Sequence, residues 1–171
     1  MRRMPIIVTV VLFTIGLIFT LLGAGWSQRP IIDYKISTLP GSFNFEHGSM
    51  KLDLEYRNRG SIDSSLNLVI TVTDGNVTVD QPEPWMGGNQ TQRKFHVAAM
   101  GHMDTYSSQA VNVSPVGDPQ NFTITYAIED TSDGWSINGI ISHLFLEAHS
   151  YYPTQAIYYR TSANTYELPM K

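Results

Sequence analysis

Short stretches of alternating apolar and polar residues dominate the chain after its N-terminal segment. The clearest is "SMKLDLEYRNRG", in which Met50, Leu52, Leu54 and Tyr56 occupy every second position and charged residues lie between them. A period of two places one set of side chains on each face of a β-strand, so this run predicts a half-buried strand. The same alternation occurs at residues 66–72 and 122–128, and weaker strands are expected at 31–38, 93–100, 108–114 and 155–162.

These strands are separated by turn-forming residues, which sets the expected fold class. Asp74-Gly75 is a typical hairpin turn and predicts a return strand through Val77 and Val79. About 7–8 short strands with Gly- and Pro-rich turns predict a mainly β domain, an antiparallel β-sandwich that is immunoglobulin-like in architecture. Tyr126 and Trp135 are expected at its core or rim.

One segment departs from the period of two. In "INGIISHLFLEAHSYY", Ile137, Ile140, Ile141, Leu144 and Phe145 follow helical spacing. We therefore predict a short helix near 138–149 whose apolar face packs against the sandwich. Pro153 would end this helix. The alternative is a strand with Ser142, Leu144, Leu146 and Ala148 on one face.

The N-terminal segment has a different pattern, with no charge between Arg3 and Arg29. Its apolar part, residues 5–26, would be about 33 Å long as a helix, close to the ~30 Å hydrocarbon core of a bilayer. Arg2 and Arg3 precede it, so the positive-inside rule predicts residues 1–4 in the cytoplasm. Trp26 falls where an interfacial aromatic residue is expected.

This pattern predicts a single-pass cell-membrane protein. Residues 5–26 form the transmembrane signal-anchor, 27–30 a short tether and 31–171 an extracytoplasmic β-sandwich domain. The alternative is a cleaved signal peptide, for which Gly23-Ala24-Gly25 supplies small residues. The apolar run is longer than the usual ~7–15 residues of a signal peptide, which favours the uncleaved anchor.

Composition and charge exclude several classes of protein. Residues 27–171 contain nine Lys and Arg and fifteen Asp and Glu, a net charge of −6, and form no basic stripe of the kind that binds nucleic acid. The chain has no cysteine. Disulfides, thiolate zinc sites, iron–sulfur clusters and thiol nucleophiles are therefore excluded, and a prokaryotic or archaeal cell envelope is favoured.

Four N-x-[ST] sequons agree with an exported glycoprotein. Their asparagines are Asn76, Asn89, Asn112 and Asn121. Pro115 makes the third sequon a poorer acceptor. The alternative is that these are ordinary polar residues of β-strands.

No catalytic motif is recognisable, so an enzyme is not expected. "GWSING" lacks the spacing of a G-x-S-x-G nucleophile elbow, and neither an H-E-x-x-H helix nor a phosphate-binding glycine loop occurs. Asp53 and Glu55 lie on the polar face of an alternating strand, which predicts a solvated face.

The one candidate metal site lies in "KFHVAAMGHMD", with His96, Met100, His102 and Met103 in eight residues and His47 as a further donor. Imidazole and thioether groups suit Cu(I). The alternative is a strand followed by a bend at Gly101, since apolar and polar positions alternate through His96. No cofactor is expected otherwise.

Three functions follow from these patterns. The first is a non-catalytic, membrane-anchored accessory or interaction subunit with a protein partner in the membrane or envelope. The alternatives are an extracytoplasmic Cu(I)-binding or copper-delivery protein, and a carbohydrate- or ligand-binding module using Trp85 and Trp135. One N-terminal helix before a β-sandwich resembles, in architecture, small archaeal envelope proteins such as archaellum stator components, although no motif carries this resemblance.

Overall fold

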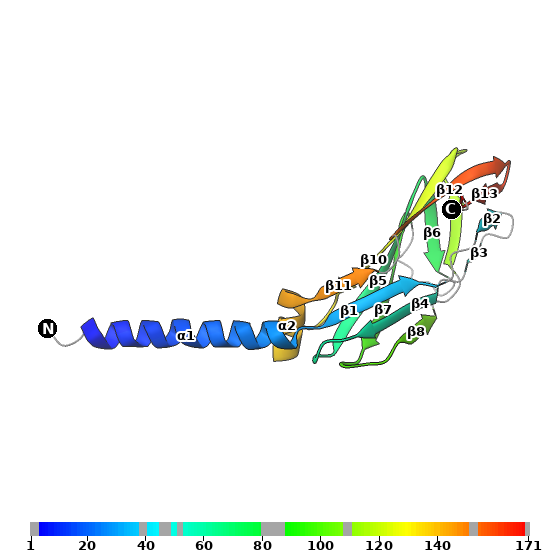
Figure 1. Ribbon diagram of the computed structural model, residues 1–171. Helices are drawn as coiled ribbons and strands as arrows, with labels where there is room; N and C mark the ends of the chain where they lie inside the picture. Colours follow the sequence, from blue (N-terminus) through cyan, green and yellow to red (C-terminus); the bar gives the residue numbers. More distant parts are fainter. Residues whose placement is uncertain are drawn as a thin grey trace.

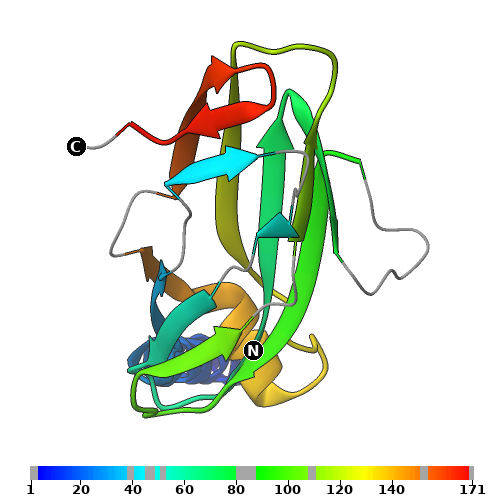
Figure 2. The ribbon, with the colours of Figure 1, turned by 90° about the vertical axis from the view of Figure 1, so that its right-hand side faces the viewer.

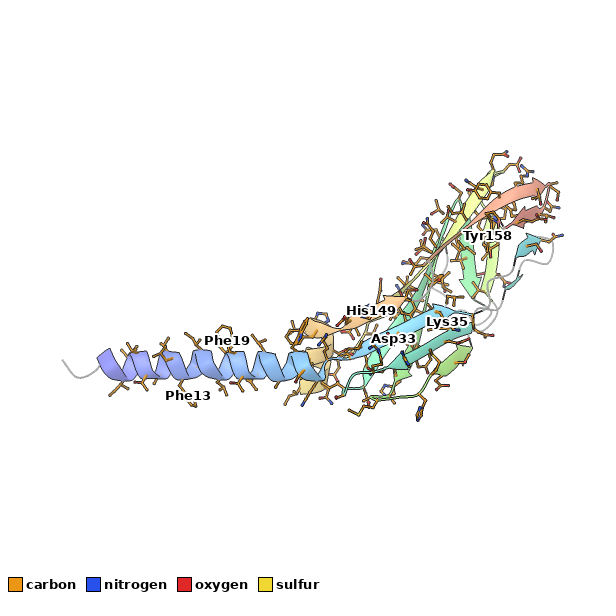
Figure 3. All side chains as sticks on the ribbon, in the orientation of Figure 1. Phe13, Phe19, Asp33, Lys35, His149 and Tyr158 are labelled. Carbon is orange, nitrogen blue, oxygen red and sulfur yellow. The ribbon has the colours of Figure 1, made fainter. Side chains whose placement is uncertain are left out.

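The computed structural model describes residues 4–37, 41–44, 49–50, 53–79, 88–107, 111–150 and 154–169. A long helix, α1 (Met4–Gln28), leads end-on into a β-rich domain (Figure 1). Its segment Ile6–Gln28 is long and apolar enough to cross a membrane, and its side chains are exposed along its length except at Gly25, which is buried. Phe13 and Phe19 project from different sides of α1, well away from the domain (Figure 3).

The largest sheet has six strands in the order β2-β13-β12-β10-β5-β7. Its two ten-residue strands pair antiparallel, with Asp130 opposite Leu66 and Thr123 opposite Thr73, and run the length of the domain (Figure 2). Asp130 marks the end of the domain beside α1, called the α1 end, and Thr73 the far end. The strands are β2 (Ser42–Asn44), β5 (Ser64–Thr73), β7 (Gln90–Val97), β10 (Asn121–Asp130), β12 (Gln155–Ser162) and β13 (Thr165–Glu167).

Two smaller sheets complete the domain. A four-stranded sheet, β11-β1-β4-β8, lies near α1, and a three-stranded sheet, β3-β9-β6, lies toward the far end (Figure 1). Their strands are β1 (Ile31–Ile36), β4 (Asp53–Asn58), β8 (Asp104–Ser107) and β11 (Glu147–Ser150), and β3 (Ser49–Met50), β6 (Gly75–Val79) and β9 (Val111–Pro115). The mainly β prediction is confirmed, with more strands than expected, because several are only two to four residues long.

The core is one cluster drawn from all three sheets. Leu66, Leu68, Ile70 and Val72 are fully buried, so the predicted inner face of β5 is confirmed. Tyr126 is buried as expected. At the far end the rings of Phe122 and Tyr158 stack with centroids 5.0 Å apart, and Tyr166 meets Phe122 edge-on at 5.1 Å. Burial raises the pKa of Tyr158 to about 12.

One predicted hairpin is wrong in its pairing, and one predicted strand is divided between two sheets. Asp74 does make a turn, with φ at 61°, but β5 pairs with β7 and β10 whereas β6 pairs with β9, so the chain changes sheet there instead of forming a hairpin. The run from Met50 to Arg57 contributes to strands of two different sheets, and Lys51 and Leu52 lie outside the described residues. Met50 belongs to β3, which pairs with β9, and Leu54 belongs to β4, which pairs with β1.

The predicted helix is present but shorter, and its orientation is reversed. α2 spans Ile137–Phe145, and the chain then enters β11, which pairs parallel with β1. That pair is an exception to the antiparallel arrangement predicted. The side of α2 buried in the domain carries Gly139 and Ser142, not the isoleucines. Trp135, expected in the core or rim, is 95% exposed.

Candidate functional site

The last turn of α1 packs directly on α2. A Cβ added to Gly25 would lie 3.2 Å from Phe145 Cε2 and 3.5 Å from Ile141 Cγ1, so a larger residue would require the Phe145 ring to shift by a few tenths of an ångström. The next residue, Trp26, meets the Phe145 ring edge-on with centroids 5.9 Å apart. The contact fixes the end of α1 to the domain through apolar side chains.

Arg29 stabilises the same junction through an ion pair and hydrogen bonds. Its Nε and Nη2 donate to Glu147 Oε2 at 2.8 and 2.6 Å, and its Nη1 donates to the Trp26 carbonyl at 2.8 Å. The guanidinium also lies 4.0 Å from the centroid of the Trp26 ring. His149 Nε2 is 2.7 Å from Glu147 Oε1. The pKa of Glu147 is lowered mainly by its hydrogen bond to Arg29 and, to a smaller extent, by that to His149. This carboxylate is therefore charged at neutral pH.

The chain between α1 and β1 is held on its other side by the β4–β5 loop. A Cβ on Gly60 would lie 2.1 Å from the Arg29 carbonyl oxygen and 2.7 Å from Pro30 Cα. The fully buried Asn58 accepts hydrogen bonds from Ile31 N at 3.2 Å and Gly60 N at 2.8 Å. The predicted tether 27–30 is therefore a packed connection: α1 continues through Gln28, and only two residues separate it from β1.

A serine network holds the inner side of α2. Ser142 Oγ donates to Asp130 Oδ1 at 3.1 Å, accepts from Ser132 Oγ at 3.1 Å and lies 3.0 Å from Ser64 Oγ. His143 Nδ1 is 3.4 Å from Asp130 Oδ2. These residue types resemble a hydrolase triad, but Ser142 is fully buried and its hydroxyl has no access to a substrate. The network positions α2 on the sheet.

The opposite side of α2 is apolar and exposed. The exposed fractions are 77% for Ile137, 43% for Ile140 and 60% for Leu144, and Trp135 precedes the helix. We call these four residues the apolar face of α2. Side-chain hydrogen bonds cap the start of the helix, where Ser136 Oγ accepts from Gly139 N. Asp133 accepts from the amides of Ser136 and Trp135, and these hydrogen bonds lower the pKa of Asp133.

An ionic cluster that the sequence pattern does not reveal lies on β1 and β4. Asp33 is 1% exposed and its carboxylate pairs with Arg57 at 2.8 Å and Arg59 at 2.7 Å. Lys35 and Glu55 form a neighbouring pair at 2.7 Å. Glu55 thus lies on a polar face as predicted, paired across the two strands, and Figure 3 shows Asp33 and Lys35 along β1.

The His/Met residues are divided between a strand and the bend after it. His96 on β7 points away from the core, between buried Phe95 and Val97, and its Nε2 lies 3.6 Å from Asp63 Oδ2. This alternation confirms the strand interpretation for that part of the motif. The bend is tied to the α1 end, because Ala99 N donates to Asp63 Oδ1 at 2.6 Å.

The remaining donors lie in that bend. Met100 adopts a φ of 49° and is 73% exposed, His102 is exposed and Met103 is 46% exposed. The amide of Met100 donates to Gly60 O at 2.9 Å, which brings the bend beside the junction. His47 lies outside the described residues. Across the described part of the chain, no three His, Asp or Glu side chains are grouped to hold a metal ion.

The sequons and Trp135 lie at opposite ends of the domain. Asn76, Asn89 and Asn121 are exposed and Asn112 is half-buried, and all four belong to strands or turns toward the far end. Trp135 is at the α1 end. Trp85 lies outside the described residues. The comparisons of the sequence with protein-family models and with curated proteins find no match.

Proposed function

We propose that this protein is a non-catalytic, membrane-anchored accessory subunit that holds a β-domain in a fixed position at the outer face of a cell membrane. α1 is the uncleaved span, Arg2 and Arg3 keep the N-terminus cytoplasmic, and the domain is an extracytoplasmic sandwich of immunoglobulin-like architecture. Its proposed role is to bind a protein of the membrane or envelope.

The junction carries this proposal. A domain that acts by diffusing to its target would be joined to its anchor by a flexible linker. Here Gly25 packs on Phe145, Arg29 forms an ion pair with Glu147, and Gly60 packs against the backbone of the residues that connect α1 to β1. These contacts set the height and orientation of the domain relative to α1, which is what an element that braces or positions a neighbour requires. The sequons support the orientation, because their asparagines lie on strands and turns away from α1.

The experiment is purification of the full-length, C-terminally tagged chain from its native membrane in mild detergent. We expect a stoichiometric membrane or envelope protein to remain bound through size-exclusion chromatography. A matched variant with a Gly-Ser insertion between Gln28 and Arg29 keeps both contact surfaces and should retain less of the partner. A chain that runs alone in both forms would contradict the proposal. Labelling of a cysteine introduced at Val116 by an impermeant maleimide on intact cells tests the orientation.

A second candidate function is Cu(I) binding on the bend after β7. The observation in its favour is that Met100, His102 and Met103 are all exposed in one short segment that main-chain hydrogen bonds hold in place. Soft thioether donors of this kind favour Cu(I) over Zn(II). Ligand binding by Trp85 and Trp135 stays a prediction.

A further inference from the structure

Within the part of the chain that the structure describes, the apolar face of α2 is exposed and does not pack on the domain. An amphipathic helix on a water-soluble domain turns its apolar side inward. In α2 the buried positions are Gly139 and Ser142, and the inward contacts are the serine network described above. Ile137, Leu144 and Trp135 point into the surroundings instead, at 77%, 60% and 95% exposure.

The position of this face identifies what covers it. α2 packs on the last turn of α1 through Gly25 and Trp26, so it lies level with the end of the apolar span (Figure 1). If α1 crosses a bilayer, this level is the boundary between acyl chains and headgroups. Tryptophan is enriched at that boundary, and short amphipathic helices lie in its plane with their apolar side in the lipid.

We infer that α2 and Trp135 insert into the headgroup–acyl boundary of the outer leaflet beside α1, so that the domain rests on the bilayer at two points. The inference rests on the proposed anchoring by α1 and names the lipid surface as the partner of this face. α2 carries no Lys or Arg, the acidic Asp133 precedes it, and the nearby Arg29 is paired with Glu147. The attraction is therefore apolar, and zwitterionic phosphatidylcholine is sufficient.

The test uses tryptophan depth quenching on the full chain in phosphatidylcholine nanodiscs. In the W26F/W85F variant, Trp135 is the only tryptophan. We expect it to lose most of its emission when the lipids carry bromine near the headgroup end of the acyl chain, and to lose less when the bromine is near the methyl end. Equal loss without and with 1 M salt, a screening condition, would agree with an apolar contact.

The W85F/W135F variant, which keeps Trp26, separates the two proposals. Quenching of Trp26 without quenching of Trp135 would overturn the inference and leave the anchoring intact; it would indicate a protein on this face instead. Quenching of neither would contradict the anchoring as well. As a second measurement, I137S/L144S should reduce Trp135 quenching without lowering the melting temperature in detergent. Ile141 faces α1, so the matched variant I141S should lower the melting temperature. Unchanged quenching in I137S/L144S would also overturn the inference.

Discussion

Gly60 is the position at which the packed connection is most sensitive to substitution. In Gly60→Ala the new Cβ would lie 2.1 Å from the Arg29 carbonyl oxygen and 2.7 Å from Pro30 Cα, whereas real Cβ atoms essentially never approach closer than 3.0 Å. Both neighbours are backbone atoms. The β4–β5 loop and the segment after α1 must therefore separate by roughly 1 Å, because packed interiors have no spare volume.

The energetic cost has two parts. Overpacking of this kind costs about 1–3 kcal/mol. The separation also weakens the hydrogen bonds of the buried Asn58 to Ile31 and Gly60, and an unsatisfied buried acceptor costs about 1–3 kcal/mol. The total of about 2–6 kcal/mol corresponds to a fall of roughly 4–24 °C in melting temperature, at about 2–4 °C per kcal/mol for a chain of this size.

The assay is thermal unfolding of the full chain in detergent, followed by the circular dichroism of the β-domain. Gly134→Ala is the matched control, since its Cβ would meet nothing within 4 Å. That substitution should leave the melting temperature unchanged or slightly higher, because alanine restricts the unfolded chain. If the Gly60→Ala protein has the same melting temperature as the Gly134→Ala control, the packed connection is refuted.

Three further predictions concern single sites. Burial raises the pKa of Tyr158 to about 12, so the neutral phenol stabilises the fold below pH 10, and this contribution is lost as the pH rises toward 12. Tyr158→Phe should therefore shift alkaline unfolding, followed by fluorescence, to higher pH. The pKa of Glu147 is lowered by Arg29, so the contribution of this carboxylate to stability is present above pH 4.5 and is lost as the pH falls through the lowered pKa. Glu147→Gln should therefore make the melting temperature depend less on pH in the acid range. An unchanged dependence would argue against the Arg29 contact. Titration with Cu(I) should show binding that Met100→Ala and His102→Ala weaken about tenfold or more, and equal binding by all forms would remove the copper proposal.

The features that sequence predicted best are those set by local pattern. The apolar run gave α1 to within two residues at each end, because a long uncharged stretch has few other solutions. The alternation of Leu66 to Val72 gave both a strand and its buried face. The Asp74 turn was also found, since its residues favour a left-handed backbone, but the sheet joined by the next strand depends on β9, more than thirty residues later.

The junction was not predictable, because its parts are far apart in sequence. Arg29 and Glu147 are separated by 118 residues and meet only because β11 pairs with β1. The orientation of α2 was predicted wrongly for a related reason. The periodicity of Ile137, Ile140 and Leu144 identifies an apolar face but not what covers it, and the rule that such a face turns inward assumes water on the other side.

The fixed junction between α1 and the domain is the central claim, and a distance distribution tests it directly. The chain has no cysteine, so spin labels on Gly23→Cys in α1 and Val116→Cys at the far end are the only labels. Double electron–electron resonance in nanodiscs should give one narrow distribution, which broadens when a Gly-Ser segment is inserted between Gln28 and Arg29. A distribution as broad without the insertion as with it would contradict the fixed junction.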